Sequence, residues 1–215
     1  TLGWRWVAGL QTRGKTYLAR PDNIAKYTGG RFHPAPGTLA TQAPAVDGPP
    51  PPAPGAPPGD AAFDPDQPTA LVLHEDDLSP GWLFDRGLKP VATAVLTPSA
   101  GLSPLEMAPQ VLAFRRALAE DAATRWAARL GPVTHVDTGT DLAAWAAATG
   151  AAQIVAPYAP VGAVPPALAQ IGAVPVIRPL RIYDRQAWPH ATAGFFRFRD
   201  KIPRLLADLR GVRAA

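Results

Sequence analysis

The sequence contains no cysteine, and this absence excludes disulfide bonds, thiolate metal sites and cysteine nucleophiles. It lacks an apolar run of about eighteen residues and a charged-then-apolar leader, so neither a membrane span nor a signal peptide is predicted. No glycine-rich dinucleotide fingerprint or Walker loop occurs, and no Ser-His-Asp set or carboxylate pair stands out. We therefore expect a cytoplasmic protein without a metal site and without motifs for nucleotide binding or hydrolysis.

Positive charge is concentrated at the start of the chain, although the net charge of all 215 residues is only +4. Residues 1–33 hold six Lys or Arg and one Asp, whereas the remainder holds fifteen Lys or Arg and sixteen acidic residues. Trp4 and Trp6 lie in this segment, where flanking glycines favour a helical turn that places the two rings on nearly opposite sides. Cations interleaved with aromatic rings suit phosphates and unstacked bases. It stays open whether these rings instead fill a core and the cations lie on a solvated face.

Three short runs in this segment carry a more specific signal. They are Trp4-Arg5-Trp6-Val7-Ala8-Gly9, Gly14-Lys15-Thr16-Tyr17-Leu18 and Asp22-Asn23-Ile24-Ala25-Lys26-Tyr27-Thr28. Together they resemble the late FAD-binding region of the photolyase/cryptochrome family. The resemblance implies that Trp4 transfers electrons next to the flavin and that Trp6 packs against a flipped pyrimidine dimer. It further implies that Arg5, Arg13 and Lys15 bind the phosphates of damaged DNA.

The resemblance also implies FAD as the cofactor and places most flavin-contacting residues, including an asparagine, upstream of Thr1. The chain begins within the motif, so we expect an N-terminally truncated piece that could not hold FAD alone. In the intact protein, reduced FAD would absorb blue light and pass an electron to a pyrimidine dimer. A cryptochrome-like photoreceptor without repair is the alternative within the family. Outside it, the alternative is a non-catalytic α/β binding module tethered to a basic nucleic-acid anchor.

Residues 34–68 are rich in Pro, Ala and Gly and contain the nearly uninterrupted proline run of residues 49–58. Such a composition buries too little apolar surface to fold, which predicts an extended or disordered linker between residues 1–33 and 69–215. We also expect residues 1–33 to be poorly ordered or weakly docked, because so short a segment buries little apolar area.

After the linker, short apolar runs alternate with helical patterns. The expected strands are 70–74, 91–96, 133–136, 153–156 and 174–177, and the expected helices are 104–130, 141–149 and 166–171. In the longest helix an apolar face is predicted from the spacing of Met107, Val111, Phe114, Leu118, Ala122 and Trp126. The alternation predicts a Rossmann-like three-layer α/β/α domain with a parallel sheet, preceded by a short helical remnant of an all-α FAD-binding domain.

Four runs in this second domain resemble the α/β antenna domain of photolyases and cryptochromes. They are Leu71-Val72-Leu73-His74-Glu75-Asp76-Asp77-Leu78, Ala151-Ala152-Gln153-Ile154-Val155-Ala156-Pro157-Tyr158, Arg181-Ile182-Tyr183-Asp184-Arg185 and Phe195-Phe196-Arg197-Phe198-Arg199. His74 and Glu75 replace arginines of the family, and the order of the two domains is reversed. A second, antenna chromophore is therefore left unassigned.

Three histidines are considered as site residues. His74 and the acids of residues 75–77 follow the first strand, at the edge where open α/β sheets bind ligands. A solvated turn is the plainer expectation for this cluster, and a metal or ligand site is the alternative. His135 is expected to be structural within its strand. His190 is expected on a loop, where binding groups concentrate, but without a base or nucleophile beside it.

Overall fold

The computed structural model describes residues 18–42, 55, 61–99, 101, 103, 105–191 and 194–213. The chain divides into two compact units, Thr1–Pro54 and Gly55–Ala215. The central part of the expected linker lies outside the described residues.

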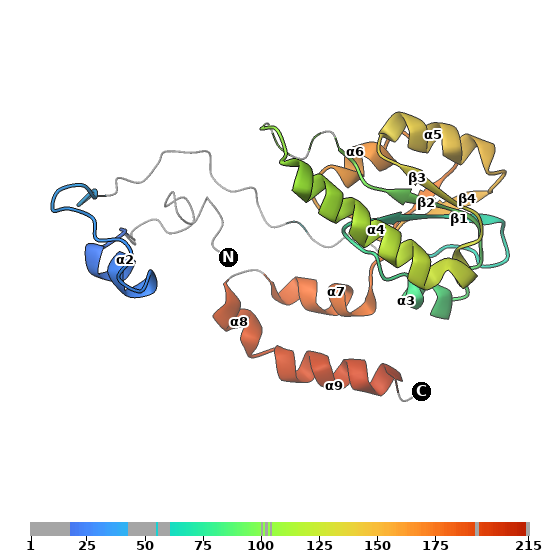
Figure 1. The fold of residues 1–215 in the computed structure, drawn as a ribbon. Helices are drawn as coiled ribbons and strands as arrows, with labels where there is room; N and C mark the ends of the chain where they lie inside the picture. Colours follow the sequence, from blue (N-terminus) through green and yellow to red (C-terminus); the bar gives the residue numbers. More distant parts are fainter. Residues whose placement is uncertain are drawn as a thin grey trace. The chain divides into compact units, whose positions relative to one another are not determined.

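The first unit contains the short helix α2, Pro21–Tyr27, drawn in blue in Figure 1. Its first residue is a proline, which suits the start of a helix, and Asp22 in the first turn complements the helix dipole. Arg20 donates two hydrogen bonds to the Asp22 carboxylate, at 3.0 and 2.7 Å. The chain leaves the helix through Thr28 and Gly29, whose positive φ of 61° ends the helical path. None of the α2 residues is buried, so this helix has no core of its own.

The second unit is built on a five-stranded parallel sheet with the order β3-β2-β1-β4-β5. The strands are β1 (Thr69–His74), β2 (Pro90–Leu96), β3 (Val133–Val136), β4 (Gln153–Val155) and β5 (Val176–Ile177). This sheet and its covering helices confirm the predicted Rossmann-like three-layer α/β fold. The expected strand 174–177 contributes only its last two residues to the ladder.

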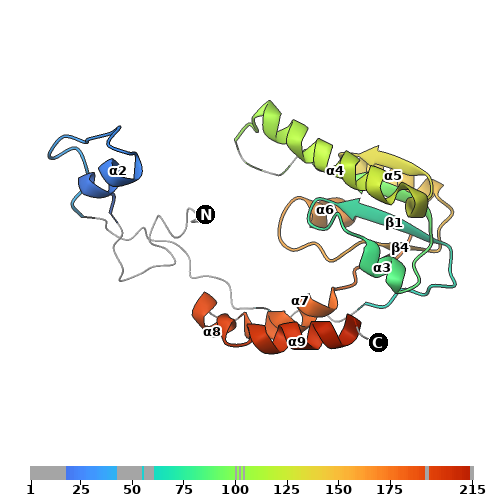
Figure 2. The same ribbon diagram turned by 60° about the horizontal axis from the view of Figure 1, so that its bottom comes forward.

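Helices cover both faces of the sheet, as Figures 1 and 2 show. They are α3 (Gly81–Asp85), α4 (Pro109–Leu130), α5 (Gly139–Ala148) and α6 (Val164–Leu168). Alternate residues of β1 point to opposite faces, so Ala70 and Val72 join one core cluster with α5 and α6, while Leu71 and Leu73 join the other with α3 and α4. Every residue of β1 is buried, as expected for a central strand covered on both sides.

Helix α4 begins at Pro109, later than expected, and buries only part of its predicted face. Ala122 is buried and Trp126 packs against the core, but Val111, Phe114 and Leu118 are 39, 63 and 43% exposed. The reason is length, because a helix of 22 residues spans about 33 Å whereas the strands beside it are seven residues or shorter. The N-terminal end of α4 extends beyond the sheet in both views (Figures 1 and 2).

The folded unit begins earlier than the predicted boundary at residue 69. Phe63 is 8% exposed and packs in the core cluster beneath α3 and α4. The Gln153 side chain donates to the Asp64 carbonyl at 2.5 Å and accepts from the Asp64 N–H at 3.2 Å. One aromatic anchor and two hydrogen bonds between the Gln153 side chain and the Asp64 backbone thus make residues 61–68 part of the α/β unit rather than linker.

Four short helical segments follow the sheet at the C-terminal end of the second unit. They are α7 (Ile182–Ala187), the 3-10 turn η1 (Trp188–His190), α8 (Phe195–Arg199) and α9 (Ile202–Arg213). Helices α7 and α9 contact each other, and α8 lies at the end of this pair that points away from the sheet (Figures 1 and 2).

Candidate functional site

The strand order of the sheet changes direction at β1. The chain adds β2 and β3 on one side of β1 and then returns to place β4 and β5 on the other side. Open α/β sheets bind their ligands outside the carboxyl ends of the strands at such a switch point. At this position β1 ends with His74, and Pro157 follows β4.

The His74 side chain bridges these two strand ends. It is fully buried, and its Nε2–H donates to the Pro157 carbonyl oxygen at 2.8 Å, since a carbonyl can only accept. In the neutral ring Nδ1 then carries a lone pair. It has no hydrogen-bond partner among the described residues and lies 4.0 Å from the Asp76 carboxylate. Burial lowers the pKa of His74 more than Pro157 and Asp76 raise it, which keeps the ring neutral near pH 7.

Glu75 forms an ion pair with an arginine that lies 40 positions later in the sequence. Arg115 of α4 donates to both Glu75 carboxylate oxygens at 2.5 Å and to the Pro98 carbonyl at 2.8 Å. The two side chains are mostly buried, at 13 and 23% exposure, which favours a fixed bidentate geometry. This pair connects the N-terminal third of α4 to the turn after β1.

Asp77 forms the second pair of this turn, with Arg181 just before α7. Arg181 donates to the two carboxylate oxygens at 2.7 and 2.5 Å, and the Trp82 indole N–H donates to Asp77 at 3.3 Å. The Arg181 guanidinium also donates to the Ser79 carbonyl and lies 5.2 Å from the Trp82 ring. Burial opposes the charge of Arg181, but the hydrogen bonds and attraction of Asp77 outweigh it and raise the pKa of Arg181.

Asp76 is the acid of this turn that lacks an arginine partner among the described residues, and burial raises the pKa of its carboxyl. Side chains of the domain itself therefore fill the switch point. His74 is buried there, Arg115 neutralises Glu75, and Arg181 neutralises Asp77. The solvated turn expected from sequence is present only in part, because Asp76 is exposed whereas Glu75 and Asp77 are paired with arginines. In the described part of the chain, no three His, Asp or Glu side chains lie close enough to hold a metal ion.

The same turn does not fit a flavin or nicotinamide dinucleotide. A pyrophosphate at this position needs closely approaching backbone N–H groups from a glycine-rich turn and a helix N-terminus. Here the turn carries three carboxylates and no glycine before Gly81. Asp76, which has no arginine partner among the described residues, repels a phosphate, so this turn does not fit the pyrophosphate of a dinucleotide.

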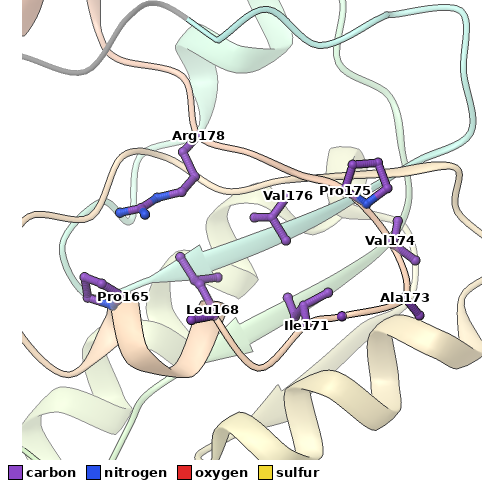
Figure 3. Close-up of a pocket in the computed structure, with 10 residues that line it drawn as sticks. Pro165, Leu168, Ile171, Ala173, Val174, Pro175, Val176 and Arg178 are labelled. Atoms are coloured by element: carbon purple, nitrogen blue, oxygen red, sulfur yellow. The ribbon is translucent and has the colours of Figure 1, made fainter.

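A hollow lies at the β5 edge of the sheet, as Figure 3 shows. It has a volume of about 480 Å³ and is lined by aliphatic side chains of α6 and of the segment leading into β5, including Leu168, Ile171 and Val176. Arg178 stands at one end of it, where its guanidinium donates to the Ala159 carbonyl at 2.9 Å. The hollow offers apolar surface and one cation, but no nucleophile or base.

A second hollow, of about 250 Å³ and with a polar lining, lies at the carboxyl ends of β2 and β3. Thr97, Arg116, Glu120, His135 and Asp137 line it. The exposure of His135 corrects the prediction of a structural histidine, because β3 is an edge strand with only Val136 buried. His190 ends the 3-10 turn η1 and is exposed, so it lies in a short helical turn rather than an irregular loop.

The site residues predicted from the opening segment lie outside the described residues: Trp4, Arg5, Trp6, Arg13 and Lys15. The sequence pattern predicts the turn after β1 but not the two arginines that pair with its acids. Arg115 is 40 positions from Glu75, and Arg181 is 104 positions from Asp77. No local pattern could have revealed either partner.

The second unit thus defines a three-layer α/β domain whose switch point is closed by ion pairs. Comparison with protein-family models, curated proteins and solved structures finds no match to this chain. Among its described helices, none has the length and apolar character needed to span a bilayer.

Proposed function

We propose that this chain is part of a blue-light-dependent FAD flavoprotein of the photolyase/cryptochrome type, with repair of pyrimidine dimers in DNA as its activity. The observation that carries the proposal is the run from Trp4 to Tyr27, followed in the same chain by a parallel α/β domain. Trp4 would relay electrons, Trp6 would stack on the damaged bases, and Arg5, Arg13 and Lys15 would bind phosphates. Damaged bases can flip out and stack in this way, because the lesion lowers the free energy needed to unpair and unstack them from the duplex.

The turn after β1 does not fit a flavin dinucleotide, and the photochemistry is assigned to none of the described residues. In this proposal the α/β unit is a non-catalytic module. Its acids Glu75 and Asp77 are neutralised by arginines, and His74 is buried. These groups are therefore unsuited to act as bases or nucleophiles on a substrate.

This closed switch point also favours a second candidate function, in which the α/β unit is a binding module without any light-dependent partner domain. The two candidates differ in one simple property. A flavoprotein is yellow as purified and is reduced by blue light in the presence of an electron donor, whereas a binding module is colourless and unaffected by light.

The test uses the complete gene product that contains this chain. We expect a flavin absorption spectrum, slower photoreduction in Trp4→Phe, and loss of dimer splitting with weaker binding of dimer-containing DNA in Trp6→Ala. Trp145→Phe, on α5 of the α/β unit, is the matched control and should leave all three properties unchanged. A yellow protein that binds DNA but splits no dimers under light would leave the photoreceptor alternative. A colourless protein would refute the flavoprotein proposal and leave the binding module.

A further inference from the structure

A second cationic segment lies at the C-terminal end of the α/β unit. Residues 194–213 hold six Lys or Arg and two Asp, whereas residues 61–191 hold nine Lys or Arg and twelve acidic residues. The charge after residue 33 is balanced overall, but residues 61–191 are acidic and residues 194–213 are basic. Such segregation of charge indicates a polyanionic partner for the basic part more than a general need for solubility.

Two aromatic rings lie exposed within this segment. Phe195 and Phe196 of α8 are 61 and 74% exposed, and their ring centroids lie 5.6 Å apart in an edge-to-face arrangement. The Arg199 guanidinium lies 5.6 Å from the centroid of the Phe196 ring. Exposing two large aromatic side chains side by side is unfavourable in water unless a partner covers them.

The cations of this segment are exposed as well and only weakly neutralised. Arg199 lies 3.4 Å from Asp200, with side chains 58 and 69% exposed, and Arg204 lies 4.0 Å from Asp208. Exposed pairs of this kind contribute little, so the arginines remain available to a stronger anion. We call the following set the aromatic–basic surface: Phe195, Phe196, Arg197, Arg199, Lys201 and Arg204.

We propose that the aromatic–basic surface binds single-stranded nucleic acid, with Phe195 and Phe196 stacking on unpaired bases and the four cations contacting phosphates. A duplex hides the faces of its bases, so exposed rings select strands whose bases are unstacked. An interfacial membrane helix is less well matched, because it separates an apolar face from a polar face, whereas the aromatic residues of α8 alternate with arginines after Phe196. Helix α8 has five residues and exposes only these two rings beside its arginines.

This site lies in a different segment from Trp4 and Trp6, and it requires neither light nor damaged bases. It therefore goes beyond the proposed function and can be tested separately from it. Binding in the dark to undamaged DNA would persist even if the gene product proved colourless.

The test measures binding of the full chain to fluorescein-labelled oligothymidylate by fluorescence anisotropy, in the dark, against a labelled duplex of equal length. Phe195→Ala/Phe196→Ala should weaken oligothymidylate binding by about tenfold or more, because each lost stack removes a sequence-independent contribution. Val161→Ala is the control, since Val161 is 98% exposed and lies outside the surface.

The charge contribution is tested by the salt dependence of the same binding. Arg197→Gln/Lys201→Gln should make the salt dependence weaker. The negative slope of log K against log salt should become smaller in magnitude by about 1.4, since each lost phosphate contact removes about 0.7 on a single strand. Arg125→Gln, on the exposed side of α4, is the matched control and should leave the slope unchanged. Unaltered affinity in the double Phe variant would overturn the proposal. Binding to phosphatidylserine vesicles without binding to oligothymidylate would overturn it as well, in favour of a lipid surface.

Discussion

Replacing Asp77 by Asn should destabilise the α/β unit more than any surface charge change. The substitution keeps the shape of the side chain but removes the charge that two N–H groups of Arg181 bond, at 2.7 and 2.5 Å. It leaves the charge of Arg181, whose side chain is only 20% exposed, without its counter-ion. The Trp82 indole also loses a charged acceptor.

The magnitude follows from burial. Removing one partner of a fully buried pair costs about 3–5 kcal/mol. Asn still accepts one hydrogen bond, and a fifth of the Arg181 side chain reaches water. We therefore expect a loss of about 2 kcal/mol in the free energy of unfolding, which corresponds to about 4–8 °C in Tm for a domain of this size.

The assay is urea unfolding followed by tryptophan fluorescence, together with a thermal melt. Asp121→Asn is the control, because Asp121 forms an exposed i,i+4 pair with Arg125 and should cost under about 0.5 kcal/mol. In a double-mutant cycle with Arg181→Gln, the coupling energy should reach about 1 kcal/mol or more. If Asp77→Asn unfolds at the same urea concentration as Asp121→Asn, the Asp77–Arg181 pair does not stabilise the domain.

Three further predictions concern the core and its pH dependence. Phe63→Ala should cost about 3 kcal/mol in urea unfolding, whereas Phe114→Ala, at an exposed position, should cost under about 1 kcal/mol; equal costs would place Phe63 outside the core. Burial lowers the folded-state pKa of His74, so the unfolded state takes up the proton first and stability should fall as the pH drops below about 6.5; His74→Phe should flatten this part of the curve, and an unchanged slope would contradict the assignment. In Gly81→Ala the new Cβ would lie 2.9 Å from the Trp126 ring, so a lower Tm is expected, and an unchanged or higher Tm would show that the ring moves aside freely.

The fold could be predicted from the sequence because its central strands are short runs of buried apolar residues separated by helical patterns. β1 and β3 were located to within one residue, and Gly150, at φ 66°, follows the end of α5 as expected. The buried face of α4 was only half predicted. Spacing identifies which residues share a face of a helix, but not how far the neighbouring sheet extends beneath it.

The candidate site was harder to predict for a related reason. The acids after β1 could be placed at the carboxyl edge of the sheet from the strand pattern alone. Whether they face water, a ligand or cations depends on side chains far away in the sequence, here Arg115 and Arg181. Phe63 was assigned to the linker because prolines dominate its surroundings, although a single aromatic side chain is enough to anchor a segment to a core.

The central position of β1 has a consequence for how the chain folds. Its first neighbour, β2, follows within about twenty residues, but its other neighbour, β4, begins 84 positions after Thr69. During synthesis from the N-terminus, the edge of β1 therefore stays unpaired until most of the domain has left the ribosome. An apolar strand with an open edge is prone to pair with other chains, so the nascent domain should depend on chaperones during this interval.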